Sequence, residues 1–459
     1  MENMGQRMTP VNLFILIFKK LQYCIKYILI IFVFGVALLG SNELLEYILV
    51  DDTSSYTRLT MHELYNQSEN IDVLFLGSSH CYRSLDTNIT DSIFEMNTFN
   101  AGTSSQSWDG SYALLVETGK HNTLKKVYLE MYYEMAGDIY SERTQMTKTY
   151  IISDYMRPGI NKMKYLINAG NSDQWINGFI PARREWYRLF DFTYLEGVHK
   201  RKSQKCYKDF SYIQPSEEEY YAGKGYVANT NCVGDSLFNS DTHFESAKRS
   251  FSEDDIKSLE KIVSYCKKKG IELVLFSAPM PDFRLLDSGD YDEYIDYVTQ
   301  FAKEHKIRYY DFNLCKDPYF SYDIEMFKDT DHLNKLGAEQ FSLLFSVFFT
   351  GKITDKELFY ETYQDKIRFS DKIYGIICEQ RELENSTIKV TVEVIHGDLA
   401  NGNVRISGQR NSYEQEIGSK DSPEKMEIEI TRNEKSNVCV AITSNSNAQN
   451  LDYLYYLEK

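Results

Sequence analysis

Two short segments made up only of apolar residues, 73–76 and 273–276, constrain the fold of this 459-residue chain more than any other feature. A strand buried on both faces shows no alternation of polar and apolar residues, and such strands belong to parallel sheets covered by helices on both sides. Helix-like segments separate the strand-like ones, which is the pattern of an α/β domain. We therefore predict a five-stranded parallel sheet, with strands at 71–76, 97–101, 126–131, 271–277 and 307–312.

The first of these strands runs into a Gly-Ser-Ser turn, so that Ser79 stands where a strand ends and a helix begins. A serine hydroxyl needs a neighbouring base to take its proton, and imidazole, with a pKa of about 6.5, suits that role. His332 is a candidate base, and Asp329, three residues earlier, is placed to accept the other N–H of its ring. Asp331 is adjacent to His332, and we expect its side chain to point elsewhere. The pattern predicts a nucleophile, a base and an orienting acid.

Residues beside Ser79 and after the second strand complete the predicted site. Gly102 offers an amide that no side chain obstructs, and we predict it as an oxyanion donor together with the backbone N–H of Ser79. His80 should project away from the nucleophile, which favours substrate contact or local packing over a role as base. Arg83 is a candidate for binding an anionic substrate group, although a solvated arginine on a helix is the ordinary alternative.

Over about 71–350 the sequence resembles the SGNH, or GDSL-type, superfamily of esterases and acyltransferases. Gly-Ser-Ser at 77–79 is similar to its first block, with serine in place of the usual aspartate. Asn-Ala-Gly at 100–102 is similar to its second block, and Asp-Thr-Asp-His at 329–332 to its closing block. The resemblance implies a flavodoxin-like SGNH fold, a catalytic triad of Ser79, His332 and Asp329, and oxyanion or substrate contacts at Asn100 and Gly102.

The third block departs from the family, which usually has an asparagine oxyanion donor after the third strand. Here 127–134 contains none. Lacking this residue, the chain looks like the cell-envelope branch anchored by one N-terminal helix, whose members help to esterify lipoteichoic acid or to acetylate exopolysaccharides. The resemblance implies a glycan or teichoic-type polymer as acceptor and a membrane-bound O-acyltransferase as partner. Two alternatives stay open: a plain hydrolase of surface acyl esters, and a non-catalytic glycan-binding scaffold with a vestigial site.

An apolar run at 27–39, extended to 23–42, reaches about the 20 residues that a bilayer-crossing helix needs. Basic residues precede the run and acidic residues follow it, so the positive-inside rule places 1–22 in the cytoplasm. A cleaved signal peptide is the competing interpretation, but no Ala-x-Ala pattern follows the run. We predict a single-pass anchor in the cell membrane, a linker at 43–70 and an extracytoplasmic catalytic domain.

Two further regions extend the predicted architecture. A long insertion at about 135–250 has predicted helices around 159–168 and 175–192 and is rich in aromatic residues. Aromatics at this spacing are usually core, with a lid or glycan platform as the rival interpretation. After a helix expected at 335–349, short alternating strands predict a small all-β sandwich at 370–459.

Composition excludes several classes of function. The net charge of −16 argues against nucleic acid as a partner. The eight cysteines lack the spacing of a disulfide framework or of a zinc site. No glycine-rich phosphate loop follows an apolar strand. The sequence therefore indicates no metal and no organic cofactor.

Overall fold

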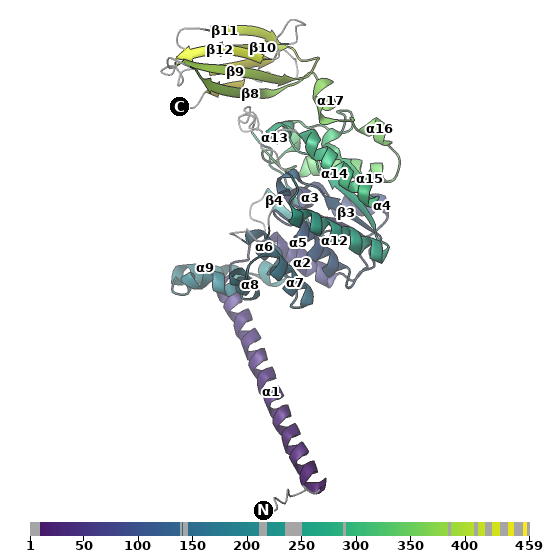
Figure 1. Ribbon diagram of the computed structural model, residues 1–459, viewed down its shortest axis with the longest axis vertical. Helices are drawn as coiled ribbons and strands as arrows, with labels where there is room; N and C mark the ends of the chain where they lie inside the picture. The colour runs from purple at the N-terminus through teal and green to yellow at the C-terminus, as the bar shows by residue number, and fades with distance from the viewer. Residues whose placement is uncertain are drawn as a thin grey trace, which may run out of the picture. The chain divides into compact units, whose positions relative to one another are not determined.

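The computed structural model describes residues 10–137, 140, 146–210, 218–234, 250–287, 291–383, 387–407, 412–417, 425–431, 439–444 and 453–456 (Figure 1). The chain divides into two compact units. One unit joins Met1–Thr53 to Asp173–Asp209, and the other joins Ser54–Ser172 to Phe210–Lys459. Each unit is described by itself.

The larger unit is built on a five-stranded parallel sheet with the strand order β2-β1-β3-β6-β7. Numbered along the chain, this is the order 2-1-3-4-5 of flavodoxin-like doubly wound sheets, so β1 lies between β2 and β3. The predicted five-stranded parallel sheet is confirmed. The strands are β1 (Val73–Leu76), β2 (Thr98–Asn100), β3 (Lys126–Glu130), β6 (Glu272–Ser277) and β7 (Arg308–Asp311).

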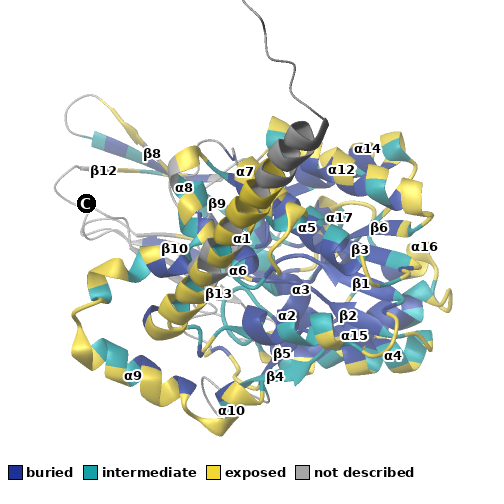
Figure 2. Ribbon diagram, turned by 90° about the horizontal axis from the view of Figure 1, so that it is seen from below, coloured by how far each residue is buried: buried dark blue, intermediate teal, exposed yellow. Residues whose placement is uncertain are grey.

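Both faces of this sheet are buried, which explains the uninterrupted apolar strands (Figure 2). Leu74 and Leu129 belong to one core cluster, together with apolar residues of α5 (Trp108–Thr118), α12 (Glu253–Lys269) and α14 (Tyr291–His305). Phe75 and Tyr128 belong to a second cluster with α15 (Lys335–Phe349), whose Phe345 lies edge-on to both rings. Successive residues of a strand thus bury opposite faces.

The insertion contributes to both units. In the larger unit it forms α6 (Thr147–Ser153), α7 (Ile160–Ala169) and the hairpin of β4 (Glu219–Gly223) and β5 (Tyr226–Asn229). The smaller unit contains η3 (Pro181–Arg188), α9 (Phe192–Lys202), α10 (Lys205–Lys208) and all of α8 (Ser172–Phe179) except its first residue. The core interpretation of the insertion's aromatics is wrong for five of them, which are exposed: Phe179, Trp186, Tyr187, Phe190 and Phe192.

The predicted anchor at 23–42 lies within the long helix α1 (Pro10–Leu49) of the smaller unit. Among the described residues, however, no helix combines the length and the apolarity needed to cross a bilayer. The structure does not support the prediction of a membrane-spanning helix.

The C-terminal segment forms two antiparallel sheets, β12-β9-β8 and β11-β10-β13-β14. Buried apolar residues of both sheets, among them Val390 and Val404, share one core. Two sheets over one core are the arrangement predicted for 370–459. The strands are β8 (Ile373–Glu382), β9 (Thr387–His396), β10 (Gly402–Ser407), β11 (Ser412–Ile417), β12 (Lys425–Thr431), β13 (Cys439–Ser444) and β14 (Tyr453–Tyr456).

Candidate active site

Ser79 is the first residue of helix α3 (Ser79–Ser84), which begins just beyond the carboxyl end of β1. Ser78 caps this helix by accepting the backbone N–H of His80 on its Oγ at 3.2 Å. The turn leaves no room for a side chain at Gly77, because a Cβ there would lie 2.5 Å from Glu130 Cβ. The glycine lets the backbone pass close to β3 and fixes the position of the serine that follows.

The structure brings Ser79, His332 and Asp329 together. His332 Nε2 lies 2.8 Å from Ser79 Oγ, although 253 positions separate the two residues. On the other side of the ring, His332 Nδ1 lies 3.1 Å from Asp329 Oδ1. Asp329 Oδ1 also accepts the backbone N–H groups of Asp331, at 2.9 Å, and His332, at 2.7 Å. The carboxylate that closes the turn therefore also holds the imidazole.

The segment that carries His332 is held in place by helix α15, which follows it. Asn334 is the N-cap of α15 and accepts the backbone N–H of Gly337 on its side chain at 3.0 Å. Its amide group donates to the backbone oxygen of Glu325 at 2.7 Å. A capped helix packed on the sheet thus fixes the end of the turn that holds the histidine.

The environment lowers the pKa values of both Asp329 and His332, which suits the roles they would play. Burial raises the pKa of Asp329, but the hydrogen bond and charge of His332, with Lys328, hold it well below its usual range. Burial lowers the pKa of His332, and the neighbouring His80 lowers it further, against the opposing effect of Asp329. The structure therefore favours an ionised Asp329 beside a neutral His332, whose Nε2 can accept a proton.

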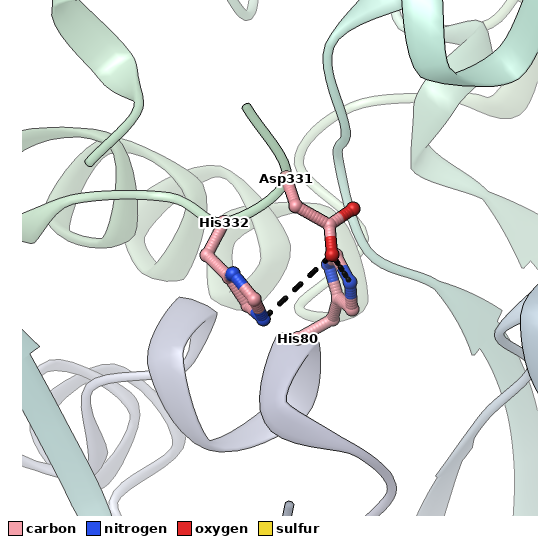
Figure 3. Close-up of side chains that lie close together, drawn as sticks. All are labelled: His80, Asp331 and His332. Atoms are coloured by element: carbon pink, nitrogen blue, oxygen red, sulfur yellow. Dashed lines mark ion pairs between the residues drawn. The ribbon is translucent and has the colours of Figure 1, made fainter. Parts of the chain in front are cut away.

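Asp331 does not point away from the site, which corrects the expectation from sequence. Its Oδ2 lies 3.4 Å from His80 Nε2 and 3.9 Å from His332 Nε2 (Figure 3). The reason is the turn closed by Asp329, which directs two adjacent side chains to the same side. Arg284 Nε lies 3.6 Å from Asp331 Oδ1. Burial alone would raise the pKa of Asp331, but His80 above all, and the charge of Arg284, lower it.

His80 is buried, with 3 % of its surface exposed, and it packs between two rings. The ring centroid of His332 lies 4.6 Å away and that of Tyr132 lies 4.2 Å away. Burial lowers the pKa of His80, but the charges of Asp331 and Glu130 outweigh burial and raise it. Of the two roles predicted for His80, the geometry shows the packing one.

Arg83 is buried and paired, so it is not the solvated arginine of the ordinary alternative, and binding of an anionic substrate group stays a prediction. Its Nη1 lies 2.8 Å from Glu219 Oε2 on strand β4. Glu219 also accepts hydrogen bonds from Tyr56 OH and Asn229 Nδ2, both at 2.9 Å. Despite partial burial, these partners lower the pKa of Glu219 to about 2. The guanidinium therefore joins α3 to the hairpin of the insertion.

Asn100 and Gly102 are occupied by contacts within the fold. Asn100 is fully buried, and its Nδ2 donates to the backbone oxygen of Cys81 in α3 at 2.9 Å. The backbone N–H of Gly102 donates to Asn100 Oδ1 at 3.1 Å, so the predicted second oxyanion donor is engaged. The structure thus places the buried Asn100 as a link between β2 and α3.

Glu130 is a residue at the site whose role the sequence did not indicate. It ends β3, within the 127–134 segment that lacks the asparagine expected from the resemblance, and it is 3 % exposed. Its Oε2 accepts the backbone N–H of Ser78 at 2.5 Å, while Trp108 Nε1 donates to its backbone oxygen at 3.4 Å. Burial raises its pKa, although His80 and Ser78 oppose that rise. The only sequence signal that could have indicated this role is the position of Glu130, an acidic residue at the end of an otherwise largely apolar strand.

Searches against protein-family models and against curated proteins find no match. A solved structure described as a platelet activating factor from Streptococcus pneumonia is 12% identical, covers 68% of this chain and 98% of its own, and has a TM-score of 0.30. A two-domain esterase active on acetylated mannans is 10% identical, covers 88% and 93% of the two chains, and has a TM-score of 0.27. A gut microbial diltiazem-metabolizing enzyme is 11% identical, covers 80% and 74%, and has a TM-score of 0.19. Similarities at this level identify neither a family nor a substrate, and the chemistry of the site follows from its own geometry.

Proposed function

We propose that this chain is a serine esterase or O-acyltransferase with Ser79 as nucleophile, His332 as base and Asp329 as orienting acid. The observation that carries the proposal is the 2.8 Å contact between Ser79 Oγ and His332 Nε2, with Asp329 at the opposite nitrogen of the ring. Nucleophile, base and orienting group in hydrogen-bond reach of one another are the arrangement that acyl transfer through serine requires.

In the proposed reaction Ser79 Oγ attacks the carbonyl carbon of an acyl ester while its proton passes to His332 Nε2. Asp329 accepts the hydrogen bond of Nδ1–H and stabilises the imidazolium that forms. The tetrahedral intermediate expels the alcohol, which takes the proton from Nε2 and leaves an acyl group on Ser79. Water or an acceptor hydroxyl then attacks this acyl group through the same steps in reverse. Water gives an esterase, and an acceptor hydroxyl gives an O-acyltransferase.

The oxyanion needs backbone donors near Ser79 Oγ. We propose the backbone N–H of Ser79 itself, which opens α3. The backbone N–H of Gly102 bonds to Asn100 Oδ1, so it would have to exchange that partner for the oxyanion. A single oxyanion donor is worth roughly 3–4 kcal/mol of the barrier in a serine hydrolase.

The substrate class is proposed from sequence alone. The three motif blocks and the missing third-block asparagine support an acyl group, chiefly acetyl, on a cell-surface glycan or teichoic-type polymer. They also support a membrane-bound O-acyltransferase as the partner that supplies the acyl group. Location outside the cytoplasm rests on the basic residues before 27 and the acidic residues after 42.

A direct test compares the full chain with Ser79→Ala on a small acetyl ester and with a fluorophosphonate probe. We expect the probe to form an adduct at Ser79 and the variant to lose both labelling and hydrolysis. Ser68→Ala, which alters an exposed serine, is the matched control and should keep both. Labelling that persists in Ser79→Ala would refute Ser79 as the nucleophile. A wild-type chain that neither labels nor hydrolyses the ester would favour the non-catalytic glycan-binding scaffold.

The same assay separates an esterase from a transferase. An oligosaccharide alcohol added during turnover should divert the acyl group from water if the chain is a transferase. The ratio of acylated sugar to free acetate is the readout. A ratio that does not change with acceptor concentration would assign hydrolysis alone.

A further inference from the structure

Three side chains with metal-binding atoms converge beside Ser79 from two distant segments. The ligand atoms of His80, Asp331 and His332 all lie within 4.8 Å of one another (Figure 3). Asp331 Oδ2 is 3.4 Å from His80 Nε2 and 3.9 Å from His332 Nε2. Ligand atoms around tetrahedral zinc stand roughly 3.3 Å apart, given metal–ligand bonds of about 2.0–2.1 Å. The cluster is therefore close to the spacing that one ion would impose.

An independent observation points to a ligand at the same place. Within the described residues, His80 Nε2 is buried and makes no hydrogen bond. His80 Nε2 and Asp331 Oδ2 are 3.4 Å apart, which is an ion-pair contact. A buried polar atom without a hydrogen bond is destabilising. A cation between His80 and Asp331 Oδ2 would give His80 Nε2 a partner.

The donor set selects the kind of cation. Two imidazole nitrogens and one carboxylate oxygen suit zinc and its neighbours in the first transition row, whereas magnesium and calcium prefer oxygen ligands alone. The fourth position would face Ser79 Oγ, which lies 2.8 Å from His332 Nε2.

Binding has a geometric consequence for His332. The two imidazole planes are only 19° from parallel, so one ring must turn before both lone pairs can meet at one ion. The side chain of His80 is 2% exposed and that of His332 is 18% exposed, so His332 has the greater freedom. Turning that ring, or occupying its Nε2, breaks the contact with Ser79 Oγ.

We infer that His80, Asp331 and His332 form a binding site for a zinc-class divalent cation, and that its occupation inhibits the nucleophile by taking the Nε2 lone pair of His332 from Ser79. The cation site stands on the ligand geometry, while the inhibition rests on the proposed function. His80 would thus be a regulatory neighbour of the proposed triad.

Calorimetry on the purified full chain tests the site without reference to catalysis. We expect one Zn²⁺ per chain and an affinity that falls on the order of 10- to 100-fold or more in both His80→Gln and Asp331→Asn. His121→Gln removes an exposed histidine outside the cluster and should leave the affinity unchanged. Circular dichroism checks that each variant is folded. Because there are two independent variants, the test still holds if one of them does not fold. Equal affinity in wild type and both variants would overturn the site.

Cobalt substitution distinguishes this site from a cysteine site, since Cys232 is exposed. Co²⁺ bound by imidazole and carboxylate shows visible ligand-field bands without a thiolate charge-transfer band. A thiolate band that survives Asp331→Asn would place the ion elsewhere and refute the inference.

Fluorophosphonate labelling then tests the inhibition. Zn²⁺ should protect Ser79 from the probe in wild type, a chelator should restore labelling, and His80→Gln should be less sensitive to zinc. Binding at the cluster without protection would refute inhibition. Ester hydrolysis that requires Zn²⁺ would also refute it and favour a metal-assisted reaction. If Ser79 fails to label even without zinc, the proposed function falls, whereas the calorimetric result still decides the cation site.

Discussion

The imidazole ring of His80 lies nearly parallel to that of His332, with 4.6 Å between the ring centroids and 19° between the planes. Tyr132 packs on His80 at a centroid distance of 4.2 Å. The proposed base is therefore supported at two places, by Asp329 at Nδ1 and by the buried ring of His80 at its face. A change in the size or charge of His80 reaches His332 directly, and the site has to be tested as a group of coupled residues.

The nucleophile and base should act as one unit. Ser79→Ala and His332→Ala should each lower kcat/KM on an acetyl ester by about 10³-fold or more, and the double variant should be little worse than either single one. The reason is that the serine has no base without the histidine, and the histidine has no proton to accept without the serine. Steady-state kinetics of the three variants provide the measurement. Losses that multiply would show that the two residues work independently.

The two aspartates should differ in what they affect. Asp329→Asn should lower kcat by roughly 10⁴-fold while leaving the fold intact, because the amide no longer fixes the tautomer of His332. Asp331→Asn should cost less in rate but about 1–3 kcal/mol in stability, because it leaves His80 buried without its counter-charge. Kinetics and urea denaturation of both variants separate the effects. A reversed ranking in rate would transfer the orienting role to Asp331.

The turn before Ser79 should tolerate no side chain at Gly77. Gly77→Ala should lower stability by about 1–3 kcal/mol, because its Cβ would meet Glu130 Cβ at 2.5 Å and Cys81 Cβ at 2.8 Å. Gly234→Ala is the matched control, since no heavy atom of the described residues lies within 4 Å of its added Cβ. Denaturation midpoints of the two variants decide the matter. Equal midpoints would mean that β3 moves away from the turn at little cost.

The Arg83–Glu219 pair should make stability depend on acid pH. The folded-state pKa of Glu219 is lowered to about 2 from an ordinary value of 4.5. Its contribution is therefore complete above pH 4.5 and is lost as the pH falls through 2. The stability difference between wild type and Glu219→Gln should shrink steadily over that window, as denaturation at a series of pH values would show. Glu253→Gln, at a side chain 91% exposed, should show no such trend. A difference for Glu219→Gln that stays constant would exclude the pair as its source.

Local sequence patterns correctly predicted the elements that depend on local interactions, such as strand β1 and helix α15. The apolar run at 73–76 allowed only a strand buried on both faces, and β1 occupies those residues. The helix expected at 335–349 coincides with α15, because Asn334 caps it and its phenylalanines follow a helical period. The proximity of Ser79 and His332 was also foreseen, although their catalytic roles stay predictions.

The errors occurred where a distant segment or a tight turn decides the outcome. Arg83 looked solvated because its partner, Glu219, comes from a hairpin of the insertion that no local pattern links to α3. Asp331 was expected to point away because neighbouring side chains diverge in extended chain, but the turn at Asp329 aligns it with His332. Gly102 was expected to keep its N–H available, and the buried side chain of Asn100 takes it.

Trp108 lies in the core behind the nucleophile turn, with its indole nitrogen bonded to the backbone of Glu130 and its ring packed on Phe251 at 4.9 Å. Glu130 in turn holds the backbone of Ser78. The chain has two other tryptophans, and Trp186 is exposed. Replacing Trp175 and Trp186 by phenylalanine would leave Trp108 as the only tryptophan, linked to Ser78 through Glu130 by two hydrogen bonds. The tryptophan emission of the unlabelled protein would then report whether Glu130 and the turn at Ser78 stay in place when Ser79 is acylated.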